Sequence, residues 1–100
     1  MTETVAKMLA VHSNGDGPRT AVSRLRKIEV RGASKDDVIK VEFSGQNLNY
    51  VPDPLVLRGS LSRTVNYPRG FVQVKRLAGK SPITVLAFCE RSTNVVNATE

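Results

Sequence analysis

The sequence predicts one small domain built mainly of β-strands, folded as an antiparallel β-barrel or β-sandwich of five to six strands. The chain has 100 residues, which is close to the commonest size of a single domain. Valine is its most frequent apolar residue and tryptophan is absent, and β-branched side chains fit a pleated, half-buried surface. Short alternating or apolar segments recur between turns rich in Gly, Pro and Asn, which is typical of small all-β domains. We therefore expect an arm with a Gly-rich hinge over residues 1–18, one β-domain over 19–91 and a polar tail over 92–100.

The N-terminal arm is compatible with a short helix over residues 2–12 or with an extended segment. Val5, Met8 and Leu9 follow the i, i+3, i+4 spacing of one helix face. A helix of this length is not stable alone in water, so the segment has to dock on something. We expect these three apolar residues to form an assembly arm. Residues 13–18, which contain two glycines and a proline, predict a loop or hinge.

Two alternating segments follow, and they predict an antiparallel hairpin. Within Arg24–Arg31 and within Val38–Ser44, apolar and charged residues alternate with a period of two. The polar residues 33–37 between them predict the turn. In such a hairpin Glu29 and Glu42 would lie outward on adjacent strands and pair with neighbouring basic residues.

The second half of the chain predicts further strands separated by turns. The expected strands are 55–57, extended through a bend at Gly59 into 62–67, then 71–77 and 83–89. The expected loops and turns are 45–54, 68–70 and 78–82. The last strand is apolar on both faces, which is expected of a central strand.

The composition restricts the chemistry that the chain can perform. Cys89 is the only cysteine, so no internal disulfide and no thiolate zinc cluster can form, and a reducing compartment fits. No apolar run approaches the ~20 residues that span a bilayer. The first residues contain no basic segment followed by a long apolar one, as a secretory signal would. We expect a cytoplasmic or virion protein with no membrane contact.

No active site is evident. His12 is the only histidine and lies beside a flexible loop, and Asp36-Asp37 is the only acidic pair. Gly79-Lys80-Ser81 resembles the end of a phosphate-binding loop, but the glycine required at position 74 is a valine. No Gly-x-Ser-x-Gly nucleophile motif occurs. The sequence predicts no enzyme, no catalytic residue, no cofactor, no metal and no small-molecule substrate.

Positive charge is the strongest remaining signal. The chain has 15 basic and 9 acidic residues, a net charge of +6, and nine of the basic residues are arginine. Such a surplus attracts polyanions or acidic protein surfaces; it is equally compatible with a merely solubilising surface. The candidate residues for contact with a polyanion or a partner are Arg19, Arg24, Arg26, Lys27, Arg31, Arg63, Arg69, Lys75 and Arg76. Tyr50, Tyr67 and Phe71 lie near loops beside these charges and are candidates for base stacking.

Two functions remain open. The first is a non-catalytic structural subunit of a viral capsid, a decorating protein or a similar oligomeric assembly, with a basic contact surface and self-association or a larger assembly as its partner. The alternative is a small β-barrel that binds single-stranded DNA or RNA through its Arg/Lys face. An adaptor that caps an acidic protein surface is a further candidate.

Overall fold

The computed structural model describes residues 2–11, 16–45 and 51–92, which form one antiparallel sheet of six strands. The strands are β1 (Thr2–Leu9), β2 (Thr20–Arg31), β3 (Val38–Ser44), β4 (Leu55–Arg58), β5 (Leu61–Ala78) and β6 (Thr84–Ser92). Their order across the sheet is β1-β6-β2-β5-β3-β4. The prediction of a mainly β fold is confirmed.

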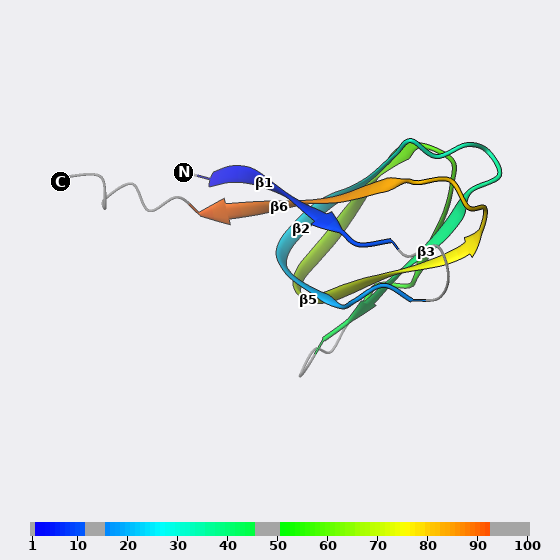
Figure 1. The fold of residues 1–100 in the computed structure, drawn as a ribbon. Helices are drawn as coiled ribbons and strands as arrows, with labels where there is room; N and C mark the ends of the chain where they lie inside the picture. Colours follow the sequence, from blue (N-terminus) through cyan, green and yellow to red (C-terminus); the bar gives the residue numbers. More distant parts are fainter. Residues whose placement is uncertain (1, 12–15, 46–50, 93–100) are drawn as a thin grey trace.

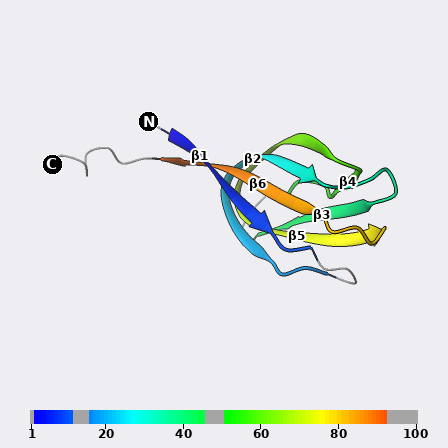
Figure 2. The same cartoon turned by 45° about the horizontal axis from the view of Figure 1, so that its top comes forward.

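The sheet curls strongly around its core (Figures 1 and 2), because the long strands β2 and β5 bend. Its concave face carries the largest buried side chains, among them Leu25, Ile28, Val41 and Tyr67, all fully or nearly fully buried. The two edge strands, β1 and β4, do not pair with each other. The described residues therefore form one open, curled sheet, and neither a closed barrel nor a two-sheet sandwich is confirmed.

Of the two alternatives for the N-terminal arm, the short helix is wrong and the extended segment is correct. Residues 2–9 form an extended strand that pairs with β6 at every position, from Thr2 opposite Ser92 to Leu9 opposite Val85. In a strand the side-chain period is two, so Val5 and Leu9 share a face while Met8 points to the other. Leu9 is buried and Met8 is 72% exposed. The segment is a strand in spite of its helical spacing. A helix of this length is not stable on its own in water, whereas the strand is stabilised by main-chain hydrogen bonds to β6.

The predicted hairpin of β2 with β3 is also wrong, although both segments are strands. In the sheet β5 lies between them: β2 pairs with β5 and β6, and β3 pairs with β4 and β5. The alternation correctly identified inward side chains such as Ile28 and Val41. It contains no information about which strand lies alongside, since strand partners are set by contacts distant in sequence.

β5 is a single strand where the sequence predicted two strands and a turn. Residues 68–70 lie inside it, and the chain bends there instead of reversing. Gly70 has a φ of 155°, and it packs directly beneath the Tyr67 hydroxyl, which donates a hydrogen bond to the Ser44 carbonyl oxygen (2.5 Å). The Tyr67 ring also packs edge-on against Phe43, with ring centroids 5.2 Å apart. The single strand expected to run through Gly59 is instead two strands, β4 and β5, which lie on either side of this residue.

Candidate functional site

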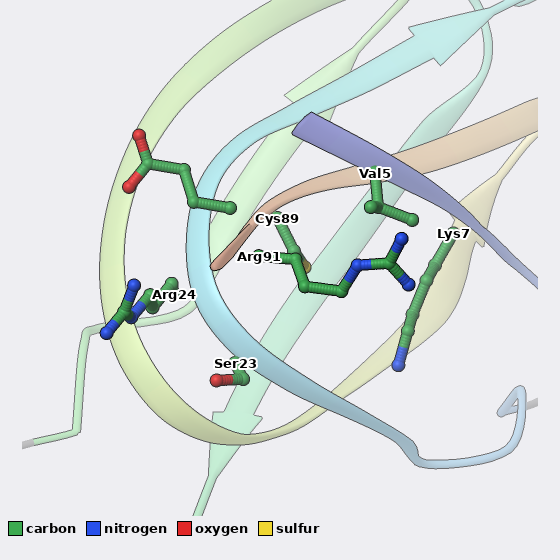
Figure 3. A pocket seen from close by; sticks show the side chains of 7 residues that line it. Val5, Lys7, Ser23, Arg24, Cys89 and Arg91 are labelled. Atoms are coloured by element: carbon green, nitrogen blue, oxygen red, sulfur yellow. The ribbon is translucent and has the colours of Figure 1, made fainter. Parts of the chain in front are cut away.

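The paired region of the sheet divides where β2 leaves β6. β2 pairs with β6 from Leu25 to Arg31, but residues 20–23 pair with β5 alone. Beyond Cys89, β6 pairs only with β1. The edge of β1 and the beginning of β2 therefore diverge, and between them lies an opening of about 490 Å³. We call this opening the seam; it is lined by Val5, Lys7, Ser23, Arg24, Cys89, Glu90 and Arg91 (Figure 3).

The bend that creates the seam is centred on Arg24. Val22 and Leu25 both point into the core, although they are three residues apart, so one residue must break the alternation. Arg24 does so with a φ of 54°; it is the only non-glycine residue of the described chain with a positive φ. This left-handed conformation costs a side-chain-bearing residue roughly 1–2 kcal/mol.

A single side chain bridges the seam. The Lys7 Nζ extends from β1 toward the beginning of β2 and donates a hydrogen bond to the Ala21 carbonyl oxygen at 2.9 Å (Figure 3). In a continuous sheet the Ala21 carbonyl oxygen would accept a hydrogen bond from a main-chain N–H of a neighbouring strand. Here it accepts one from the Lys7 ammonium.

The seam carries uncompensated positive charge. Of its two acidic neighbours, Glu90 pairs with Arg26 (2.9 Å) and Glu3 accepts a hydrogen bond from Arg91 Nε (3.0 Å). Lys7 and Arg24 form no ion pair with a carboxylate of the described residues. The two lie on opposite sides of the opening (Figure 3).

The structure divides the predicted contact residues into two groups. The first group is engaged within the chain: Arg26 bonds Glu90 and Asn66, Arg31 bonds Glu29, Lys75 bonds Glu42 and Asp16, and Arg76 bonds Asp37. Lys27 lies over the Phe88 ring at 4.5 Å. The second group, Arg19, Arg24, Arg63 and Arg69, is exposed and forms no ion pair within the described segments. Arg69 lies opposite Ser23 in the register, beside Arg24.

The ion pairs on the outer face shift the pKa values of their members. The hydrogen bond from Arg31 lowers the pKa of Glu29, and the hydrogen bond from Lys75 lowers the pKa of Glu42. The same contact with Glu42 raises the pKa of Lys75. Glu29 pairs within its own strand, and Glu42 pairs within β3 and with β5, so neither makes the cross-hairpin pair that the sequence predicted.

Asp37 is a structural residue that directly precedes β3. Its carboxylate is buried and accepts hydrogen bonds from the Ser34 amide (2.9 Å), the Ser81 amide (3.3 Å) and Arg76 (3.2 Å). These bonds, above all that of the Ser34 amide, hold the pKa of Asp37 below its ordinary value. A carboxylate so fully bonded is not available to a metal, and no group of His, Cys, Asp or Glu side chains in the described chain is placed to hold one.

Of the remaining sequence candidates, the structure describes Tyr67 and Phe71. Tyr67 is fully buried, and burial raises its pKa, so it presents no face for stacking. Phe71 is 37% exposed. His12 and Tyr50 lie outside the described residues. No helix in the part of the chain that the structure describes is long and apolar enough to cross a lipid bilayer.

Each edge strand exposes a large apolar side chain. Met8 on β1 is 72% exposed and Val56 on β4 is 57% exposed. The sequence did not reveal either edge or the seam, because both depend on strand order. One signal was present: the spacing of three between Val22 and Leu25 marks the bend at Arg24.

Comparison with known protein families, with curated proteins and with solved structures gives no match.

Proposed function

We propose that this chain is a non-catalytic structural subunit, of the kind that builds viral shells, their decorating proteins or other oligomeric assemblies, and that neighbours join it along its open strand edges. The observation that carries the proposal is the pair of edge strands, β1 and β4, each with an exposed apolar side chain, Met8 and Val56. An open strand edge is a template for pairing with another chain, and β1, with eight residues against four in β4, offers the longer edge.

The end of the β1–β6 pair supports the same function. Residues 2–4 and 90–92 pair only with each other, beyond the point where β2 has left β6. This ribbon projects from the body of the sheet (Figure 1). Two strands alone are at best marginally stable in water, so a neighbouring subunit that covers the ribbon would stabilise it.

The proposal is tested by light scattering and native mass spectrometry over a range of protein concentrations. The wild-type chain is expected to form oligomers of defined size. Met8→Lys and Val56→Lys, which place a charge on each edge, are expected to weaken association by about tenfold or more, because apolar contacts at the centre of an interface contribute most of its stability.

Leu77→Lys is the matched control. Leu77 is 53% exposed but lies on β5, an interior strand of the sheet, and its substitution should leave association unchanged. The proposal fails if the wild-type chain stays monomeric at every concentration, or if Leu77→Lys weakens association as much as the edge variants do.

A second function, binding of single-stranded nucleic acid, is supported by the unpaired arginines Arg24, Arg63 and Arg69. All three are exposed on the neighbouring strands β2 and β5. Fluorescence anisotropy with a labelled oligonucleotide tests this function. Affinity should fall steeply with salt and should be lost when all three arginines are replaced by Glu. An affinity that is unaffected by salt or by these replacements would exclude it.

A further inference from the structure

We infer that the seam accepts an extended acidic segment of a partner chain, which joins the sheet as an additional strand between β1 and the beginning of β2. This inference rests on the proposed assembly function and names the chemistry of one partner. Three independent features of the seam support it: its unpaired strand edges, the lysine that bridges it and its charge.

The first feature is the pair of strand edges. β1 pairs with β6 along one edge only, and residues 20–23 pair with β5 along one edge only. The other edge of each faces the opening lined by Val5, Lys7, Ser23 and Arg24 (Figure 3). Main-chain N–H and C=O groups at such edges lack the partners that a sheet provides. An extended peptide would pair with them, as in other cases of β-strand addition.

The second feature is the Lys7 bridge. Where a strand would donate a main-chain N–H to the Ala21 carbonyl, the Lys7 ammonium does so at 2.9 Å. An incoming strand can take over this carbonyl with its own N–H. The displaced ammonium then becomes free to bind a carboxylate on the incoming segment, so that one hydrogen bond is exchanged for a hydrogen bond and an ion pair.

The third feature is charge complementarity. Glu90 and Glu3 are already paired with Arg26 and Arg91, whereas Lys7 and Arg24 have no carboxylate partner among the described residues. The seam therefore attracts a segment with acidic side chains and repels a basic one. Arg24, whose backbone is in the left-handed region, is one of the residues that line the opening.

The probe for this inference is a capped peptide of alternating threonine and glutamate, as long as β1. Titration into the full-length chain, followed by amide NMR and hydrogen exchange, should protect amides of β1 and of residues 20–24. A peptide of alternating threonine and lysine should not bind. The acidic peptide with alternate backbone nitrogens methylated should also fail to bind, because methylation removes the donors for one ladder of hydrogen bonds.

Lys7→Glu and Arg24→Glu are each expected to weaken binding of the acidic peptide by about tenfold or more, the usual size of a lost charge-assisted hydrogen bond. Arg63→Glu is the matched control, since Arg63 is exposed but does not line the seam, and it should bind like the wild-type chain. Hydrogen exchange in the free variants verifies that each remains folded.

The inference is overturned if no binding is detected at millimolar peptide, if the lysine peptide binds equally well, or if protection appears along β4 instead. If one of these results is obtained and the chain still forms oligomers that Met8→Lys and Val56→Lys weaken, the proposed assembly function is retained and only the inference about the seam is rejected. Peptide binding in the seam by a chain that never oligomerises would instead refute self-association while supporting the seam as a strand-binding site.

Discussion

Replacement of Gly70 by alanine provides the sharpest test of the core geometry. A Cβ at position 70 would overlap the Tyr67 hydroxyl and would lie 2.5 Å from the Ser44 carbonyl oxygen. Tyr67 is fully buried, so it has no room to withdraw. The substitution must therefore break the hydrogen bond between Tyr67 and Ser44, displace β5 from β3, or both.

The expected cost of Gly70→Ala is about 3 kcal/mol. Overpacking of a core costs about 1–3 kcal/mol, and a buried polar group left without a partner costs a similar amount. For a domain of this size each kcal/mol lowers the melting temperature by about 4–8 °C. Urea denaturation monitored by circular dichroism should give the free energy of unfolding, and a thermal scan should show a midpoint lowered by more than about 10 °C.

Gly32→Ala is the control that separates the steric overlap expected at position 70 from the backbone strain of a positive φ. Gly32 has a φ of 77°, but an added Cβ would meet only the Pro82 carbonyl oxygen at 3.5 Å. Its replacement should cost about 1 kcal/mol, the ordinary penalty of a left-handed conformation. If Gly70→Ala is no more destabilising than Gly32→Ala, the packing of Gly70 against Tyr67 does not hold the bend in β5 and the reasoning is refuted.

Two further predictions concern the bend in β2 and the buried carboxylate. Arg24→Asn should raise the free energy of unfolding by about 0.5–1 kcal/mol, because asparagine tolerates the left-handed conformation better than arginine; a loss of stability in urea would instead reveal stabilising contacts of the arginine. The pKa of folded Asp37 is lowered, so its contribution to stability is present above the ordinary pKa of 3.8 and is lost as the pH falls through the lower folded value. Asp37→Asn should therefore lower the melting temperature at pH 7 and make it less sensitive to acid below about pH 4; identical acid sensitivity in the variant would show that other carboxylates control this range.

The sequence predicted the faces of the strands better than their neighbours. Alternation in the two segments 24–31 and 38–44 predicted that their apolar residues share one face, and the apolar residues Ile28, Val41 and Phe43 are all buried. Alternation reports a local requirement, namely which side of a strand meets water. The order β1-β6-β2-β5-β3-β4 depends instead on contacts between distant residues, so it could not be read from any single segment.

Charge was the least informative signal for the candidate site. Arg76 was a candidate for partner contact, yet its side chain is 5% exposed and pairs with Asp37 inside the fold. Lys7 was not a candidate, yet it bridges the seam. Both outcomes depend on what lies opposite each side chain. A buried arginine is stable only beside a matching carboxylate, and nothing in the sequence near position 76 reveals that carboxylate at position 37.

The position of β6 has a consequence for how the protein is made. Of the six described strands β6 is synthesised after the other five, and it lies between β1 and β2 in the sheet. Until residues 84–92 have emerged, β1 has no strand to pair with, and β2 lacks one of its two neighbours. While β6 is missing, the apolar side chains of β1 and β2 lack part of their cover, so the sheet is completed only after this strand has been made.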